Sequence, residues 1–248
     1  MTKYYEFSYR YPRSQEGVNV RIAGNFGQPT VLLGVNGSGK TTLMKVLAGQ
    51  LKTADGAIPE LGNVVYVPQK FESIRGFKVR DYVSYVAWLN GAGWKQSNKD
   101  ASRWIEFVGL TEHETKDCEK LSGGQQARVQ IATALNSQAD YILLDEPSAA
   151  LDPLAKRDLQ NLYRSIAASG VGLWVSSHQP LEIEAPFEQV VVLNRGIVDF
   201  QGSVQEFLAI NKNVPDHKNA VDYSEYVRAL SAAFNGGLER NSDGSGHE

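Results

Sequence analysis

One glycine-rich run constrains the fold of this chain more than any other feature of its sequence: Gly34-Val35-Asn36-Gly37-Ser38-Gly39-Lys40-Thr41-Thr42. The run follows an apolar stretch at residues 31–33, typical of a buried strand, and precedes Leu43, Met44 and Leu47 at helical spacing. Glycines leave successive backbone N–H groups free to converge on phosphate oxygens, and a helix N-terminus adds a favourable partial charge. The strand, the turn and the helix together predict a phosphate-binding loop in an α/β fold.

Two side chains of this phosphate loop (residues 34–42) suit a nucleoside triphosphate and its metal ion. Lys40 is placed to bridge the β- and γ-phosphates, and the hydroxyl of Thr41 is placed to bind Mg²⁺. A GTPase is disfavoured, because Asn98-Lys99 and Asn211-Lys212 both lack the Asp that completes a guanine-recognising Asn-Lys-x-Asp run. We therefore expect ATP with Mg²⁺.

Two carboxylates follow a predicted strand at residues 141–144. In open α/β sheets, the carboxyl ends of the strands border the crevice in which phosphates bind. We expect Asp145 to hold Mg²⁺ through a water, because Mg²⁺ keeps much of its hydration shell. Glu146 lies one residue later, so its side chain points in another direction and can polarise an attacking water.

A second pair of glycines lies in Leu121-Ser122-Gly123-Gly124-Gln125, before a helix that carries Ile131, Ala132 and Leu135. Ser122 is suited to the N-cap of that helix, and the glycines leave its first N–H groups unobstructed. The run is therefore a second candidate anion site in a chain that already has one. We infer that it covers the γ-phosphate bound by another copy of the domain.

Strands and helices alternate along the rest of the chain. Strand-like apolar runs lie at residues 64–67, 171–175 and 190–193, whereas residues 71 to about 136 follow a helical period. This alternation predicts a mostly parallel sheet covered on both faces, and the helical stretch predicts a lobe inserted between strands.

Glycines and capping residues divide the helical segments. Gly91 and Gly93 interrupt a first helix, and Asp100 can cap a second helix that Gly109 closes. Ser203-Val204-Gln205-Glu206 is a capping box that opens a short helix further on.

Composition excludes several kinds of partner. The formal net charge is −3 and no stretch gathers Lys and Arg on one face, so we do not expect nucleic acid to bind. The single cysteine, Cys118, excludes an internal disulfide and suits a reducing cytoplasm. The start has no apolar signal segment, and no apolar run approaches the roughly 20 residues of a bilayer span. Any role at a membrane therefore requires a partner protein.

The order of these motifs resembles that of ABC-type ATPases, from about residue 5 to residue 207. The resemblance rests on the phosphate loop, the Leu-Ser-Gly-Gly-Gln run and Leu143-Leu144-Asp145-Glu146-Pro147. It implies further site residues, which are Gln69 near Mg²⁺ and the attacking water, Asp152 in a loop that crosses between two subunits, His178 on the γ-phosphate, and Tyr11 (with Tyr9 as its competitor) stacked on adenine.

The resemblance also implies an architecture. The fold is a P-loop NTPase core with a mostly parallel sheet, N-terminal antiparallel strands and an inserted helical subdomain at about residues 71–136. The ATP-binding domain covers residues 1–210, and residues 211–248 form a C-terminal extension with a flexible tail.

The same resemblance implies the ligands and the assembly. ATP binds with Mg²⁺, whose ligands are Thr41, Gln69 and Asp145, and Glu146 acts in hydrolysis with His178 and Gln69. Two copies of this or a related domain close as a dimer, with the signature turn (residues 122–125) of each covering the nucleotide of the other.

Two stretches are similar to the ATPase subunits of exporters whose membrane proteins are separately encoded. They are residues 79–91, after the glutamine loop, and the closing hairpin Leu193-Asn194-Arg195-Gly196 with Gly202-Ser203. This likeness implies an ATPase that drives transport, in the direction of export, from the cytoplasmic face of the cell membrane. Its partner is an integral membrane subunit. Lys78 departs from the family, which often has a capping Ser or Thr there, so we expect the helix after it to start less firmly.

Large side chains on the first predicted helix indicate where that partner docks. Tyr85 and Trp88 lie off the apolar stripe of the helix, and exposed aromatics often anchor protein interfaces. We expect residues 71 to about 94 to receive a short cytoplasmic helix of the membrane subunit. The alternative is that these aromatics pack on the second helix, around Trp104 and Phe107.

Two other functions are alternatives to a transporter subunit. The first is a soluble ABC-type ATPase acting on a non-membrane partner. Members that act in repair or chromosome structure need a long coiled coil, and translation members join two such domains. This sequence has neither feature, which leaves a cluster-assembly ATPase. The second is a nucleotide sensor that does not hydrolyse ATP, and it is disfavoured because Glu146 and His178 are both present.

Overall fold

The computed structural model describes residues 3–14, 16–53, 55–179, 183 and 185–209. These residues form two compact units, of which the first is made of two separate stretches of the sequence and the second of one. Unit 1 comprises the described parts of Met1–Pro59 and Ser176–Glu248, and unit 2 comprises Glu60–Val175. The predicted C-terminal extension at residues 211–248 lies outside the described residues.

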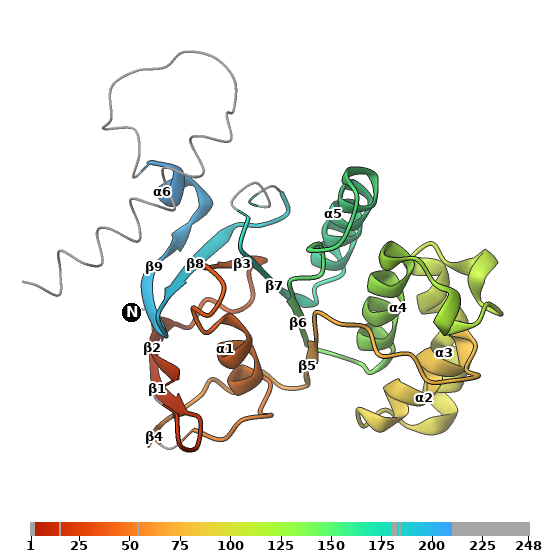
Figure 1. Cartoon of the computed structure of the whole chain (residues 1–248), viewed down its shortest axis with the longest axis horizontal. Coiled ribbons are helices and arrows are strands. Elements are labelled where there is room, and N and C mark those ends of the chain that lie inside the picture. The colour runs from red at the N-terminus through yellow and green to blue at the C-terminus, as the bar shows by residue number, and fades with distance from the viewer. Residues whose placement is uncertain (1–2, 15, 54, 180–182, 184, 210–248) are drawn as a thin grey trace, which may run out of the picture. The chain divides into compact units, whose positions relative to one another are not determined.

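Unit 1 contains the N-terminal strands, the phosphate loop and the C-terminal hairpin (Figure 1). Its described elements are β1 (Tyr4–Arg10), β2 (Gly17–Ala23), β3 (Thr30–Leu33), α1 (Lys40–Leu47), β4 (Asp55–Gly56), β8 (Gln189–Asn194), β9 (Ile197–Ser203) and α6 (Val204–Ala209).

The N-terminal strands form an antiparallel sheet. β1 pairs with β2 from Tyr4↔Ala23 to Arg10↔Gly17, and β4 pairs with the other edge of β1. Phe7 and the β2 residues Val18 and Val20 are buried, whereas the residues between them on both strands are more exposed. This alternation is typical of an antiparallel sheet with one face on the core.

The strand before the phosphate loop is buried on both faces. All of β3 is buried, and β3 pairs in parallel with β8 along Thr30↔Gln189 to Leu33↔Val192. β9 then continues from β8 as an antiparallel hairpin and leads into α6. The predicted capping box opens α6, since Glu206 accepts a hydrogen bond from the N–H of Ser203 (2.7 Å) and donates its own N–H to the Ser203 hydroxyl (3.1 Å).

In unit 2, the helical lobe lies in the sequence between two strands that pair in parallel. Its elements are β5 (Val64–Val67), α2 (Val79–Leu89), α3 (Trp94–Phe107), η1 (Thr111–His113), η2 (Cys118–Lys120), α4 (Gly123–Asn136), β6 (Tyr141–Asp145) and α5 (Pro153–Ala168). β7 (Gly172–Ser177) carries the chain from unit 2 back into unit 1.

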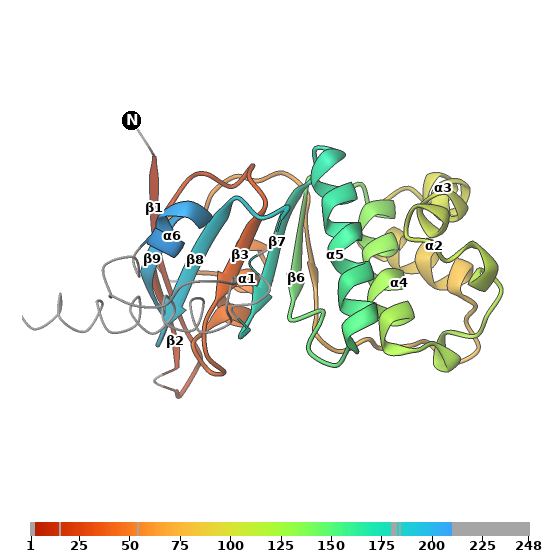
Figure 2. The same ribbon diagram turned by 90° about the horizontal axis from the view of Figure 1, so that it is seen from above.

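The helices α2, α3 and α4 pack against one another, as Figures 1 and 2 both show. Their shared core includes Val83, Ile105 and Ile131, none of which is exposed. β5 pairs in parallel with β6, and α4 contacts β5. The predicted α/β class, with parallel strand pairs and antiparallel N-terminal strands, is therefore confirmed.

Two expectations about helix starts are wrong. Asp100 does not cap a helix, because α3 begins at Trp94 and Asp100 lies inside it, bonded to Gln96. The polar run at its start is one face of an amphipathic helix whose buried side includes Ser97.

The start of α2 is also held more firmly than expected after Lys78. The N–H groups of Val79 and Arg80 donate to the carbonyls of Lys116 and Glu114, each at 3.0 Å. Backbone carbonyls from a distant segment thus replace the capping side chain that the sequence lacks.

Candidate active site

The phosphate loop adopts a backbone that only glycine permits at several positions. Gly37 and Gly39 have φ values of 80° and 104°, in the left-handed region. A Cβ at Gly34 would lie 2.4 Å from the Ser38 hydroxyl and 2.5 Å from the carbonyl oxygen of Leu193. The loop is therefore tightly wound against β8 and opens directly into α1.

Polar groups inside this loop are arranged for an anion. Lys40 is buried, at 5% exposure, and its ammonium donates to the carbonyls of Gly34 (2.8 Å) and Val35 (3.3 Å). The Ser38 hydroxyl is buried without a hydrogen-bond partner among the described residues. Beside them, the first N–H groups of α1 have no intrahelical acceptor. A phosphate fits this set of donors, so the structure agrees with the expected nucleotide.

Tyr11 lies next to the phosphate loop. Its hydroxyl is 3.3 Å from the Thr42 hydroxyl, and its ring meets that of Tyr9 edge to face at 5.0 Å. This contact with the loop supports Tyr11 as the tyrosine beside a bound base. His178, also in unit 1, is half-buried directly after β7, where the Ser177 hydroxyl accepts the N–H of Gln179 (2.9 Å).

Unit 2 carries the two carboxylates at the end of β6. Asp145 is 4% exposed, and its Oδ2 accepts a hydrogen bond from the Tyr66 hydroxyl at 2.9 Å. Sequence reasoning missed Tyr66, because residues 64–67 were assigned only as an apolar strand. The position of Tyr66 in its strand could have identified it. The two strands are parallel neighbours, and Tyr66 lies beside Leu143, two residues before Asp145.

Glu146 occupies an unusual backbone conformation. Its φ is 45°, in the left-handed region that disfavours residues with a Cβ, and such strain is concentrated at functional sites. The turn redirects the chain, and the side chain is half-buried. The backbone of Glu146 therefore departs from the extended conformation of the strand that ends at Asp145.

A small hollow of about 90 Å³ brings several predicted site residues of unit 2 together. Gln69, Gly123 and Glu146 all line it. The glutamine loop is fixed on one side, because Gln130 of α4 donates to the carbonyl of Pro68 at 2.9 Å. The predicted catalytic carboxylate, the predicted glutamine and the start of α4 thus border one space.

The signature turn is the N-terminus of α4, as predicted. Ser122 is the N-cap and accepts the N–H of Gln125 at 3.3 Å, while the Gln125 side chain accepts the N–H of Ser122 at 3.1 Å. Ser122 and Gly123 are exposed. This capping box leaves an open helix N-terminus, a geometry that suits an anion.

Asp152 caps α5. Its carboxylate accepts the N–H of Ala155 at 2.9 Å, and Pro153 follows at the first helical position. The residue is exposed, so the cap leaves a carboxylate edge at the surface. The sequence interpretation did not anticipate this capping role.

All three predicted metal ligands offer oxygen donors, which Mg²⁺ prefers. Thr41 belongs to unit 1, whereas Gln69 and Asp145 belong to unit 2. Among the described residues, no group of three or more His, Cys, Asp or Glu side chains could hold a metal ion.

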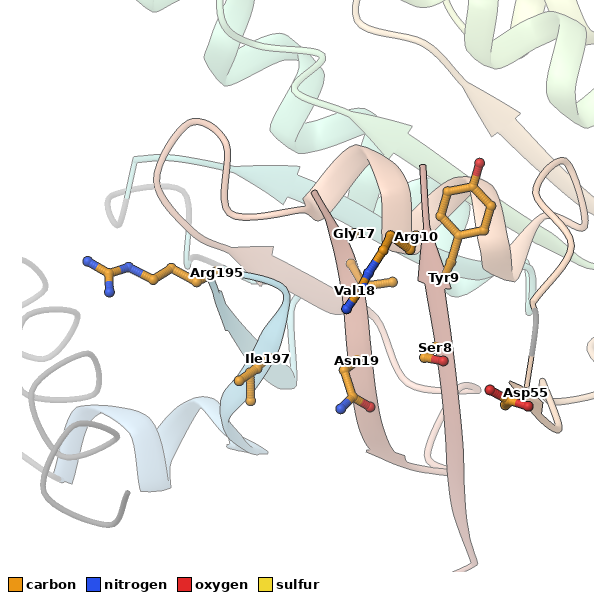
Figure 3. Close-up of a pocket in the computed structure, with 9 residues that line it drawn as sticks. All are labelled: Ser8, Tyr9, Arg10, Gly17, Val18, Asn19, Asp55, Arg195 and Ile197. Atoms are coloured by element: carbon orange, nitrogen blue, oxygen red, sulfur yellow. The ribbon is translucent and has the colours of Figure 1, made fainter. Parts of the chain in front are cut away.

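A broader hollow of about 520 Å³ lies on unit 1, and of the candidate site residues only Tyr9, the competitor of Tyr11, is among the described residues that line it. Ile197, Asn19, Ser8 and Asp55 lie along it in Figure 3. Ser8 and Asn19 are register partners on β1 and β2, between buried neighbours such as Phe7 and Val20. This hollow is therefore on the outward side of the antiparallel sheet.

Comparisons with known proteins agree on one family. The family model described as "ABC transporter" matches residues 18–149. An uncharacterized ABC transporter ATP-binding protein of Bacillus subtilis, YhaQ, is 32% identical over 199 residues, which cover 76% of this chain and 67% of that protein. The energy-coupling factor transporter ATP-binding protein EcfA1 of Thermotoga maritima is 34% identical over 212 residues, or 81% of each chain.

Solved structures show the same fold. The dimeric structure of a bacterial ABC transporter cassette matches with a TM-score of 0.69 at 22% identity, covering 82% of this chain and 99% of that one. Within the described ranges of this chain, no helix has both the length and the apolar character needed to cross a membrane.

Proposed function

This chain belongs to the ABC transporter family as an ATP-binding subunit with ATPase activity, and we propose that it drives export through a separate membrane subunit. The observation that carries the proposal is the presence, on one chain, of two open helix N-termini suited to phosphate, at α1 and α4. A chain with one ATP needs only one such cradle. The second is explained if it serves the nucleotide of another copy.

In the proposed site, the chain's own residues position ATP and water. The phosphate loop holds the phosphates, with Lys40 on the β- and γ-groups and Tyr11 beside the base. Glu146 accepts a proton from the attacking water, and Gln69 and His178 orient the water and the γ-phosphate. Positioning and charge stabilisation supply most of the catalysis in such reactions.

Mg²⁺ is proposed to accompany ATP. Thr41, Gln69 and Asp145 are its proposed ligands, because each offers a hard oxygen donor. When bound, the ion neutralises charge that develops on the phosphate oxygens. The hydrogen bond from the Tyr66 hydroxyl orients the Asp145 carboxyl group.

The working assembly is proposed to be a dimer of this or a related chain. The signature turn, residues 122–125, covers the nucleotide of the partner, and Asp152 lies in the loop that crosses between subunits. The domain that does this is proposed to be residues 1–210, with a helical subdomain at about 71–136. Closing and reopening of the dimer moves that subdomain and whatever is docked on it.

An aromatic surface on unit 2 is the proposed docking site for the membrane subunit. Tyr85 contacts Trp88 (5.8 Å between ring centroids), and Trp88 contacts Trp94 (5.9 Å). Trp88, Leu89 and Trp94 are 44%, 58% and 50% exposed. Exposed aromatics in contact favour an interface over a core role. The chain then works as a peripheral subunit on the cytoplasmic face of the cell membrane.

Export is the finer part of the proposal and rests on the likeness of residues 79–91 and of the hairpin at 193–203 to exporter subunits. Reconstitution of the copurified membrane complex in vesicles, with ATP supplied on the side of this chain, gives the direction directly. Movement of substrate toward that side would contradict export and leave the ATPase role intact.

The shared site is tested with a variant that binds ATP without cleaving it. We expect Glu146→Gln to lose turnover, because the base is gone, and to form a stable dimer with ATP but not with ADP. Adding Ser122→Arg is expected to block that dimer, since the long side chain fills the space of the partner's γ-phosphate. Sedimentation with each nucleotide measures both. Unchanged ATP-driven dimerisation of the double variant would refute a shared site.

A further inference from the structure

The side chain of Gln125, the last residue of the signature turn, is held at both ends of its amide. Its Oε1 accepts from the Ser122 N–H and from the Lys116 ammonium, each at 3.1 Å. Its Nε2 lies 2.8 Å from Nε2 of His113. Two side chains from the segment that precedes the turn therefore fix a residue within it.

The chemistry of the neighbours determines how the amide is oriented. A backbone N–H and an ammonium can only donate, so the oxygen of Gln125 must face Ser122 and Lys116. The amide nitrogen then faces His113 and donates to it. His113 must accept through Nε2, which requires a neutral ring with its proton on Nδ1.

The segment that supplies these two side chains is itself fixed to the helical lobe. Its backbone carbonyls accept the first N–H groups of α2, as described for Lys116 and Glu114. The Glu114 carboxylate accepts from the Arg80 guanidinium (2.8 Å) and from the Ser102 hydroxyl (2.6 Å). His113 and Lys116 are half-buried. The segment that contacts Gln125 is thus itself held in place by hydrogen bonds to α2 and α3.

We propose that His113 and Lys116 form a glutamine clamp, a pair of positioning residues that hold the signature turn ready for the γ-phosphate of a partner subunit. This rests on the proposed shared site. The clamp acts through Gln125, whose side chain fixes the backbone of Ser122 and therefore the direction of its hydroxyl and of the N–H groups of the glycines.

The effect of losing the clamp is conformational. Without it, the Gln125 side chain is free to leave the capping box, and the exposed turn samples conformers that cannot meet a phosphate. ATP-driven closure then has to select the competent conformer from a larger set, which weakens the dimer. Binding of ATP to the phosphate loop does not involve the turn and is expected to stay unchanged.

The test uses the full-length Glu146→Gln protein as the parent and measures the ATP-dependent monomer–dimer equilibrium by sedimentation. Lys116→Met removes the donor at similar length, and His113→Leu removes the acceptor. We expect either change to raise the dimer dissociation constant about 5- to 30-fold. This is the effect of losing one half-exposed hydrogen bond, either from the Lys116 ammonium or to the His113 ring. ATP affinity, measured by titration below the dimerisation range, should equal that of the parent.

Conservative variants separate positioning from general stability. Lys116→Arg keeps a donor and His113→Gln keeps an acceptor of similar reach, so both should recover most of the dimerisation. Lys99→Met, on the exposed face of α3, is the matched control for charge and should dimerise as the parent does. The catalytically active versions should show lower kcat with an unchanged KM for ATP.

Each outcome bears on a different claim. If the Glu146→Gln parent dimerises with ATP but Lys116→Met and His113→Leu dimerise equally well, the clamp is refuted and the shared site stands. Failure of Lys116→Arg and His113→Gln to recover dimerisation would also refute positioning through hydrogen bonds. If the parent itself does not dimerise, the shared site fails and the clamp fails with it.

Discussion

Replacing Trp88 by alanine decides whether the aromatic surface of α2 is an interface or a part of the core. Trp88 is 44% exposed, so about half of its side chain is already in water. Full burial of a large apolar side chain contributes about 1.5–3 kcal/mol, so the half-buried indole contributes about 1 kcal/mol. No closed cavity remains after truncation, because the space opens to solvent. For a chain of this length, that corresponds to a fall in melting temperature of about 2–4 °C.

Another tryptophan of the same unit supplies the reference for core truncation. Trp174 is 1% exposed, and Trp174→Ala should cost about 3–5 kcal/mol because it leaves a cavity. The melting temperature of the Trp174→Ala protein should fall by at least about 6 °C. Thermal unfolding of the isolated protein thus separates the two environments with the same substitution.

Recruitment to membranes is the functional assay for the same variants. After co-expression with the membrane subunit, we expect Trp88→Ala to bind at least about tenfold more weakly, as anchors near the centre of an interface do. Basal ATPase of the isolated protein should be unchanged. Trp104→Ala is the control, because Trp104 pairs with Phe107 on α3 at 5.6 Å, apart from the exposed cluster. The reasoning is refuted if Trp88→Ala destabilises the protein as Trp174→Ala does, or if it is recruited normally.

Three further substitutions test individual residues. Lys40→Ala should weaken ATP binding roughly 10- to 100-fold, since it removes a charged donor to phosphate; near-native affinity in calorimetry would contradict that role. Asp152→Ala should lose about 1 kcal/mol of stability, whereas Asp152→Asn should lose almost none, because both Asp and Asn cap helices. Normal ATP-driven dimerisation of Asp152→Asn would show that Asp152 caps α5 but has no role between subunits. Burial raises the pKa of the Cys118 thiol to about 11, so the thiol stays protonated below that pH; the folded protein should resist iodoacetamide at pH 8.5 and react on unfolding, and rapid labelling of the native protein would contradict this.

The sequence predicted those parts of the fold in which the local sequence pattern alone determines the structure. The phosphate loop, the strand before it, the N-cap at Ser122 and the capping box at Ser203 all depend on short-range geometry, and the structure contains each of them.

The misses share a physical cause, since each depends on contacts between distant segments. α3 begins at Trp94, before the predicted cap at Asp100, and in this first turn Ser97 is fully buried and donates its hydroxyl to the carbonyl of Trp94 at 3.1 Å. Tyr66 is tied to Asp145 across two strands, and the support of Gln125 by His113 needs the η1 segment folded back on α4. Periodicity within one element does not report such pairings.

The start of α2 has a consequence for how the chain folds during synthesis. Its first two N–H groups find their acceptors at Glu114 and Lys116, more than thirty residues later in the sequence. The first turn of α2 therefore stays unfinished on the ribosome until α3 and the η1 segment have emerged and folded back. The helical lobe then forms as one cooperative event, with the chain between α3 and α4 as its closing step and not as a passive linker.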